Sequence, residues 1–289
     1  MTTAQTAAGP DVEASGPVHV SPPPPRYRRR PPIGTGLGLG TAVLYLSLIV
    51  LVPLAAVVWR GTRGGPEAFW RAVTTPDSWS ALKLTVLASL LVAVINVVMG
   101  TVIAWVLTRD KFPGQSIVDT LIDLPFALPT IVAGLVLLAL YGVSSPIHLN
   151  LAYTQASVVV ALLFVTLPFV VRTVQPVLLE LDRDMEQAAY SLGASPGVTF
   201  RRIILPNLLP AMLSGAGLAF TRSIAEYGST VLLTGNLPFK TQVAAVNIVG
   251  RIEGDDIPSA AAVSTALLVV AFVVLILLDV AQRWGSRRD

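Results

Sequence analysis

The chain has 289 residues, of which 53% are hydrophobic and 13% are charged, and its 20 basic and 17 acidic residues give a net charge of +3. A soluble globular domain has about 25% charged residues, so this chain has too few charges to keep its apolar surface in water. An intrinsically disordered chain would show the opposite bias. The absence of cysteine excludes disulfides and thiolate chemistry. The composition therefore predicts a membrane protein, and the small net charge does not point to nucleic acid as a partner.

Long uncharged stretches predict the membrane spans, because about 20 helical residues cross a hydrocarbon core of about 30 Å. Turn residues between Gly142 and Asn150 divide the longest uncharged stretch, 124–171, into two helices. The alternation of polar and apolar residues that is typical of membrane barrels is absent. We therefore predict an all-α membrane protein with six transmembrane helices, at about residues 36–59, 83–108, 124–142, 155–178, 207–234 and 258–282.

The segment at residues 1–35 is rich in proline, glycine, serine and threonine, and we interpret it as a disordered tail. The apolar run that follows is too long for a cleaved signal peptide, so the first helix is interpreted as an anchor. Of the 20 basic residues, 13 fall on the side of the two termini, 6 on the opposite side and one inside a helix. Since cytoplasmic loops carry an excess of lysine and arginine, we predict that both tails, 1–35 and 283–289, are cytoplasmic.

Residues 180–206 form the longest predicted cytoplasmic loop, and two short helices fit its sequence. Asp182 or Asp184 can cap the first helix, and Gly193 follows its end. Ser195–Pro196 is typical of the start of a second helix, running to Leu205, because proline favours the first helical position. The first helix carries small side chains, which let the backbone of another protein approach closely. The loop therefore predicts a docking surface, with an ordinary amphipathic loop helix as the alternative.

The same loop follows the pattern Glu-Ala-Ala, three residues, Gly, nine residues, Ile, one residue, Leu-Pro. This spacing resembles the permease subunits of bacterial ATP-binding-cassette importers. The chain departs from the pattern at the first position, where glutamine stands in place of glutamate and the carboxylate lies one residue earlier. The resemblance implies a coupling helix seated in a groove of a partner ATPase. The residues assigned to this ATPase-coupling role are Glu186, Gln187, Ala188, Ala189, Gly193, Ile203, Leu205 and Pro206.

Three further segments, residues 123–130, 222–228 and 234–241, narrow the resemblance. They resemble the T-type permease of sulfate/thiosulfate importers and, less closely, the molybdate permease, and the similarity extends over residues 36–282. The resemblance implies an importer permease bundle in the bacterial cytoplasmic membrane that works by alternating access. A molybdate or tungstate permease of the same family is one alternative, and an ion-coupled secondary anion carrier is another.

The partners follow from the same resemblance. They are a second permease subunit, which is implied to be a paralogue, two ATPase subunits on the cytoplasmic side, and an external sulfate-binding protein. ATP and magnesium belong to the ATPase subunits, so no cofactor is expected in this chain.

The sequence shows no catalytic centre of its own. Residues 235–241 come nearest to a phosphate-binding loop, but they lack its second glycine and lie on the predicted outer side. Neither His19 nor His148 lies in a predicted helix, and no aspartate lies at mid-membrane. We therefore predict a transport subunit and not an enzyme, with ATP hydrolysis on partner chains and no metal site.

Two prolines, Pro125 and Pro129, interrupt the third predicted helix. Proline bends a helix and frees backbone carbonyls, which a membrane tolerates where neighbouring groups or a water-filled cavity satisfy them. One interpretation is a translocation path or gate that includes Phe126 and Thr130. The alternative is a packing kink, with Pro125 at a helix start. The family resemblance favours a pore-facing role.

Arg222 and Glu226 are four residues apart in the fifth predicted helix and therefore lie on one face. Ionisable residues inside spans usually face a bundle interior or a cavity. Either the two side chains pair and pin this helix to its neighbours, or they bear on the gate of the anion path. Ser229 and Thr230, just beyond them, are candidates to offer hydroxyls to an oxyanion.

Small residues recur in the second and fifth predicted helices, among them Gly100 and Gly215. Such residues favour close packing between membrane helices, which is a structural role. Asn96, in the second predicted helix, is expected to form a hydrogen bond between helices rather than to bind a ligand.

Overall fold

The computed structural model describes residues 33–285, with side chains from 38 to 283. The chain divides into two compact units, residues 1–50 and 51–289. In the first unit, α1 (Ile33–Leu46) continues into the π-helical turn η1 (Ser47–Leu51). The predicted tail at 1–35 lies outside the described residues up to residue 32, and its last three residues belong to α1. The tail predicted at 283–289 lies outside them from residue 286.

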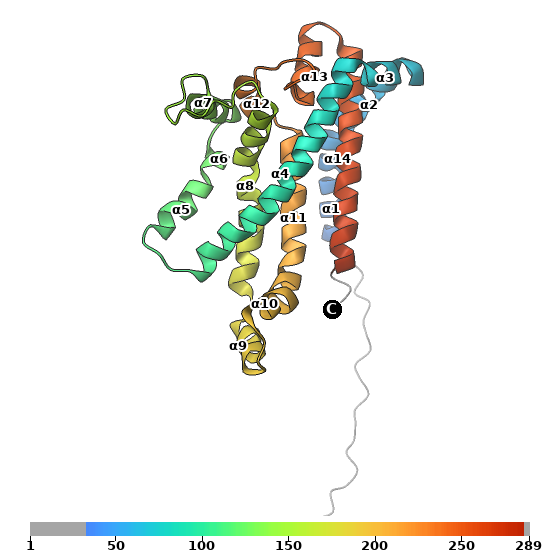
Figure 1. The fold of residues 1–289 in the computed structure, drawn as a ribbon. Helices are drawn as coiled ribbons and strands as arrows, with labels where there is room; N and C mark the ends of the chain where they lie inside the picture. Colours follow the sequence, from blue (N-terminus) through green and yellow to red (C-terminus); the bar gives the residue numbers. More distant parts are fainter. Residues whose placement is uncertain (1–32, 286–289) are drawn as a thin grey trace, which may run out of the picture. The chain divides into compact units, whose positions relative to one another are not determined.

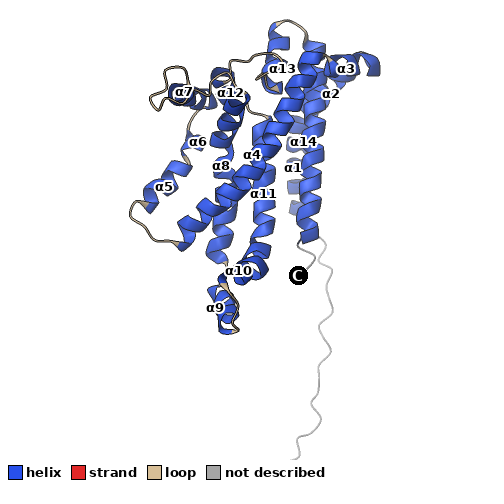
Figure 2. Cartoon of the chain, viewed as in Figure 1, coloured by secondary structure: helices blue, strands red, loops and turns tan. Residues whose placement is uncertain are grey.

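The second unit carries the features predicted to be functional, and its described residues form helices joined by loops, without strands (Figure 2). Its elements in chain order are α2 (Val52–Thr62), α3 (Gly65–Thr74), α4 (Pro76–Arg109), α5 (Gln115–Ile122), α6 (Leu124–Ala127), α7 (Thr130–Tyr141), α8 (Gln155–Glu180), α9 (Arg183–Ser191), α10 (Pro196–Thr199), the π-helical turn η2 (Phe200–Ile204), α11 (Leu205–Ile224), α12 (Gly228–Leu233), α13 (Ala244–Glu253) and α14 (Ile257–Gly285).

Helices long and apolar enough to cross a membrane dominate the described chain. Five of the described helices pass this test singly, and the bent pair Gln115–Ala127 and Thr130–Tyr141 adds a sixth span if its two parts count as one. The prediction of an all-α membrane protein is thereby confirmed. The five candidate spans are Gly38–Thr62, Pro76–Arg109, Gln155–Glu180, Pro196–Ile224 and Ile257–Arg283.

The third predicted helix, 124–142, is broken, and its prediction as one continuous helix was wrong. α6 ends at Ala127, Leu128 is extended with φ −84° and ψ 133°, and α7 begins at Thr130. The two halves of this span are bent by 117°. The cause is Pro129, because proline lacks an amide hydrogen and disfavours helical backbone in the residue before it.

The fifth predicted helix, 207–234, differs at both ends. α11 stops at Ile224, and residues 225–227 separate it from α12. At the other end, α10, η2 and α11 follow one another without a break, so the predicted second loop helix is the first part of the span Pro196–Ile224. The second predicted helix also starts earlier than 83. α4 begins at Pro76 and includes charged residues that a search for uncharged stretches leaves out.

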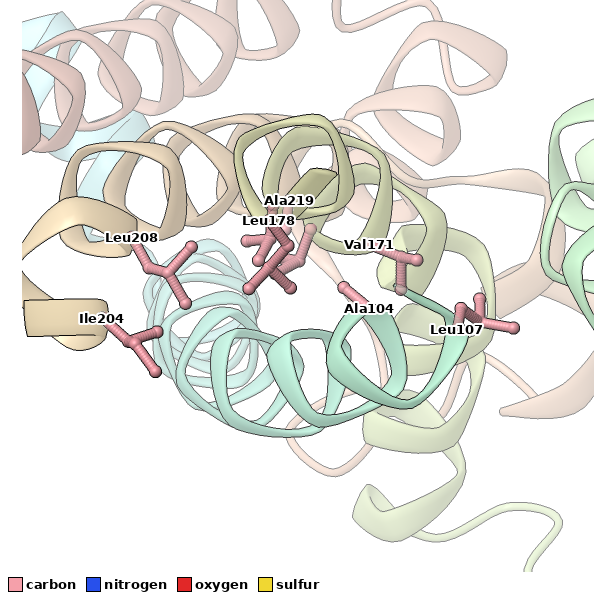
Figure 3. Close-up of a cluster of buried hydrophobic side chains, with 9 residues drawn as sticks. Ala104, Leu107, Val171, Leu178, Ile204, Leu208 and Ala219 are labelled. Carbon is pink, nitrogen blue, oxygen red and sulfur yellow. The ribbon is translucent and has the colours of Figure 1, made fainter. Parts of the chain in front are cut away.

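The core of the larger unit lies between α4, α8 and α11. Figure 3 shows side chains of Ala104, Val171 and Leu208 gathered between these helices, and all three are fully buried. Glycines allow the close approach. A Cβ on Gly100 would lie 2.9 Å from the Cβ of Val170, and one on Gly215 would lie 3.0 Å from the Cα of Val170. The prediction that small residues pack these helices is confirmed.

A buried hydrogen bond also joins two of these helices. The Asn96 side-chain amide on α4 donates to the Thr166 hydroxyl on α8 at 2.8 Å. Both residues are buried, so the bond satisfies polar groups that the core would otherwise leave unpaired. The expected role of Asn96 as a link between helices is confirmed.

The larger unit has two distinct ends (Figure 1). α9 and α10 lie at one end, and α3, α7, α12 and α13 lie at the other. α4 runs between the ends: its start is tied to α13 by the Arg251–Asp77 ion pair at 3.0 Å, and it ends at Arg109. A site on the α9 end is therefore separated from the α7–α12 end by the length of the core helices.

Candidate functional site

The first candidate site is α9, which local sequence signals define as predicted. The Asp182 carboxylate accepts a hydrogen bond from the backbone N–H of Asp184 at 2.9 Å and caps the start of the helix. At the other end, Gly193 has φ +82°, a left-handed conformation that favours glycine. Its backbone N–H donates to the Tyr190 carbonyl at 2.9 Å. The chain thus reverses at Gly193 and leaves α9 as a short projecting helix.

One face of α9 presents apolar side chains to the outside. Met185, Ala188 and Leu192 are spaced three and four residues apart and therefore share a face, which we call the α9 apolar face. All three are exposed, and Leu192 is 89% exposed. Gln187 and Gly193 are exposed beside them. An exposed apolar strip on a polar loop is typical of a surface that another protein covers.

Glu186 turns the other way, toward the end of α4. Its carboxylate pairs with the Arg109 guanidinium at 2.5 Å, and the two side chains are only 14% and 12% exposed. The guanidinium carbon of Arg109 also lies 5.3 Å from the centre of the Trp105 ring. Trp105 in turn packs edge-on against Phe200 of η2 at 5.8 Å. Glu186 therefore fastens α9 to α4 and is not part of the exposed face.

The second half of the loop motif joins the loop to the membrane helix. Ile203 and Leu205 are half-buried, and Pro206 is exposed at the start of α11. Between and beyond them, Ile204 and Leu208 are buried in the core. These positions therefore anchor α11, whereas Ala188 and Gly193 of the first half face outward and Ala189 is half-buried.

The second candidate site is the broken span at Pro125–Thr130. Phe126 and Pro129 are exposed, while Pro125 and Thr130 are half-buried. The Phe126 ring packs edge-on against Phe169 of α8, with ring centres 4.9 Å apart. The break thus carries one exposed aromatic ring that is held against α8, which is compatible with both the path and the packing interpretations.

Arg222 and Glu226 form an ion pair at the break between α11 and α12. Their closest atoms, Arg222 Nη1 and Glu226 Oε2, are 2.5 Å apart. Glu226 is 2% exposed, and its other carboxylate oxygen accepts from the backbone N–H and the hydroxyl of Ser229, at 2.8 and 2.9 Å. The contacts match the interpretation that the pair pins the chain in place.

The hydroxyls of Ser229 and Thr230 are engaged within the chain. Ser229 donates to Glu226, and Thr230 donates to the Tyr227 carbonyl at 2.9 Å. Both residues are fully buried. Each hydroxyl proton is thus donated within the chain at a buried turn, and the role of these hydroxyls toward an oxyanion stays a prediction.

The two breaks pack against each other through glycines, which sequence reasoning did not find. A Cβ on Gly228 of α12 would lie 2.2 Å from the Thr130 hydroxyl oxygen and 2.7 Å from the Ile131 nitrogen. A Cβ on Gly134 of α7 would lie 2.9 Å from the Ser229 carbonyl oxygen. The structure therefore brings Thr130, Glu226 and Ser229, three of the predicted residues, to one contact between α7 and α12.

A second feature that sequence reasoning missed is the set of side chains bound to Arg172 of α8, which we call the Arg172 cluster. The Arg172 guanidinium donates to both carboxylate oxygens of Asp123, at 2.7 and 2.6 Å, and to the Asp119 carboxylate at 2.8 Å. Gln175 accepts from the same guanidinium at 2.5 Å. This two-pronged geometry fixes α5 and the start of α6 against α8. The spacing of Asp119 and Asp123, one turn apart on one helix face, was the available signal.

No three histidine or acidic side chains come together as a metal site within the described part of the chain. The sites above hold ion pairs and apolar contacts instead.

Comparison with known proteins identifies the chain. The model of the family described as "Binding-protein-dependent transport system inner membrane component" matches residues 96–288. The chain belongs to this family of importer permeases. The matched range covers the last part of α4 from Asn96, the whole of α8, α9 and α11, and both breaks, so these sites lie inside the permease domain.

Several relatives of this permease carry the name "Sulfate transport system permease protein CysT". The protein from Synechocystis sp. is 44% identical over 85% of this chain and 88% of its own. The protein from Escherichia coli is 39% identical over 88% of this chain and 95% of its own. The predicted resemblance is thereby confirmed.

A solved structure gives the same fold. A chain of a bacterial alginate ABC transporter, crystallised with an alginate-bound periplasmic protein, aligns with a TM-score of 0.70 at 15% identity. The alignment covers 85% of this permease and 92% of that chain.

Proposed function

We propose that this permease is the membrane-spanning subunit of an ATP-driven importer for sulfate/thiosulfate. The observation that carries the proposal is the exposed α9 apolar face, because it includes Ala188 of the importer loop motif and lies at the end opposite α7, α12 and α13. The names of the relatives support sulfate as substrate. In this proposal the chain forms the path, and partner ATPases that hold ATP and magnesium perform the hydrolysis.

The proposed partners follow from the two ends. Two ATPase subunits bind α9 and the corresponding helix of a second permease, a paralogue of this chain. An external sulfate-binding protein docks at the end that carries α7, α12 and α13. We also propose that both termini are cytoplasmic, because 13 of the 20 basic residues fall on their predicted side of the membrane.

The described contacts suggest how closure of the ATPases moves the path. A displacement of α9 passes to α4 through the Glu186–Arg109 ion pair and to α11 through the continuous helix α10–η2–α11. α4, α8 and α11 share one close-packed core, so they move together more readily than they slide past one another. Alternating access then amounts to opening one end of the bundle while the other closes.

Uptake of labelled sulfate by cells that lack their own importer, but express this permease with its proposed partner subunits, tests the substrate. We expect ATP-dependent uptake that unlabelled thiosulfate reduces by competition. Uptake that equimolar molybdate blocks and thiosulfate leaves unchanged would favour the molybdate or tungstate alternative. Uptake that an ion gradient drives in proteoliposomes without the ATPase would favour a secondary carrier.

A further inference from the structure

A cavity of about 430 Å³ lies between α4, the start of α8 and the loop that follows α12. Its polar lining consists of Ser80, Lys83, Gln155 and Lys240, and its remaining residues are apolar. None of the described lining residues carries a carboxylate. The cavity is separate from α9, from the Glu226 turn and from the break at Pro129.

The charges of this cavity are unbalanced. The whole chain has three lysines, Lys83, Lys111 and Lys240, and two of them line this one cavity. Neither of the two ammonium groups forms an ion pair in the described part of the chain, whereas Arg109, Arg172 and Arg251 are all paired. Two like charges at one cavity repel each other, and a bound anion would turn that repulsion into attraction.

The loop that presents Lys240 is fixed by its own hydrogen bonds. The buried Thr241 hydroxyl donates to the Thr234 carbonyl at 2.7 Å and accepts from the Leu237 backbone N–H at 3.0 Å. Asn236 and Phe239 have φ values of +53° and +63°, so the turn is tight. A loop held in this way fixes the backbone at Lys240, so little backbone entropy is lost when the loop binds an anion.

The loop is also tied to α4, which carries the other lysine. The backbone N–H of Ala244, just after the loop, donates to the buried Thr85 hydroxyl of α4 at 2.7 Å. Thr85 is two residues from Lys83. Gln155 is the first residue of α8, so the positive end of that helix also lies at the cavity. Three separate elements thus bring positive charge or hydrogen-bond donors to one space.

We propose that this cavity binds a dissolved tetrahedral oxyanion, the dianion sulfate, at the outer mouth of the permease. Two lysines match a dianion better than the single charge of a phospholipid phosphate. Lys83 and Arg109 are 26 residues apart on α4, about 39 Å at the rise of an α-helix, so the cavity lies far from α9. The assignment rests on the proposed function, which places α9 in the cytoplasm.

Binding of labelled sulfate to the complete purified transporter, in detergent and without the binding protein, tests the cavity directly. We expect Lys83→Gln and Lys240→Gln each to weaken sulfate binding about tenfold, the loss typical of one charged hydrogen bond. Lys83→Arg should retain binding because it keeps the charge. Lys111→Gln is the matched control, since it removes the lysine that lies outside the cavity.

Each outcome separates the possible explanations. Both lysines are exposed, so the variants are expected to assemble, and binding is expressed per assembled complex measured by its ATPase content. If the affinity for sulfate is unchanged in both variants, the proposed cavity site is overturned. The proposed function still stands in that case if the wild-type transporter takes up sulfate. If the wild-type transporter takes up no sulfate, the proposed function is overturned, and the cavity assignment that rests on it falls as well. Loss of a co-purifying phospholipid from a variant that combines Lys83→Gln with Lys240→Gln, with sulfate affinity unchanged, assigns the cavity to lipid and overturns the proposal.

Discussion

At the residue scale, Glu186 shows how one short helix serves two tasks. Its neighbours Met185 and Ala188 are exposed, whereas Glu186 reaches back to Arg109 at the end of α4. The arginine is held against Trp105 on its other side. A charge pair with little exposure holds its partners rigidly, and removal of one member leaves the other charge uncompensated.

We therefore predict that Glu186→Gln uncouples the permease without detaching the ATPase. The change leaves the nearly buried Arg109 unpaired, at a cost of about 2–3 kcal/mol to the contact between α9 and α4. Sulfate uptake should fall several-fold, while co-purification of the ATPase persists because the α9 apolar face is unchanged. Asp184→Asn, on the same helix with no ion pair among the described residues, is the control. Equal loss of uptake and of ATPase binding would contradict this separation of roles.

A second residue-scale prediction concerns the pair at the second break. Glu226→Gln keeps an oxygen that can accept from Ser229, but it leaves Arg222 without its carboxylate partner. We expect destabilisation of about 2 kcal/mol, less than for a fully buried charge, because 29% of the Arg222 side chain stays exposed. The measurement is the thermal unfolding temperature of the purified transporter.

The double variant Arg222→Gln with Glu226→Gln decides between pinning and gating. If the pair pins the chain, the double variant should recover part of the lost stability, because neither charge is left alone. A stability equal to that of wild type in Glu226→Gln, together with lost uptake, would favour the gate interpretation instead.

At the element scale, the spans and the capped loop helix could be predicted because each has a local cause. Uncharged length, the Asp182 cap and the glycine at Gly193 are all visible in the chain order. The break at Pro129 also had a visible cause in the sequence. Residues on both sides of the proline are apolar, however, so hydropathy alone predicts one continuous helix. The Arg172 cluster could not be placed, because it depends on which face of α8 meets α5, and this is a matter of tertiary packing.

The contact between α7 and α12 supplies the element-scale prediction. Gly228→Ala places a methyl group 2.2 Å from the Thr130 oxygen and close to the backbone of Ile131, so α7 must move away. We expect a loss of about 1–3 kcal/mol, the usual cost of overpacking, and reduced uptake. Thermal unfolding of the purified transporter measures the first effect and labelled sulfate the second.

Gly250→Ala is the matched control for this change. A Cβ at Gly250, inside α13, meets no atom within 4 Å. Alanine there should be neutral or should stabilise the helix by up to about 1 kcal/mol. If both alanine variants behaved alike, the close α7–α12 contact would not be important for stability.

At the scale of the whole larger unit, the two ends are joined by the core that α4, α8 and α11 share. α4, α8 and α11 bury aliphatic side chains and one satisfied amide, Asn96, along their contact. Interiors of this density transmit displacement instead of absorbing it. The proposed transport cycle therefore needs an ATPase bound at α9. A substitution on the α9 apolar face tests whether this face is the binding surface.

We predict that Leu192→Asp detaches the ATPase while the permease still folds. Leu192 is the most exposed apolar residue of the loop, at 89%, so an aspartate there has water around it and disturbs no internal contact. In a closed apolar groove the same charge must be desolvated, which costs several kcal/mol. Co-purification of the ATPase should fall at least tenfold, and uptake should fall with it. Val143→Asp, at a 76% exposed site in the loop after α7, is the control and should retain the ATPase. Full ATPase recovery with Leu192→Asp would place the docking surface elsewhere at the end that carries α9.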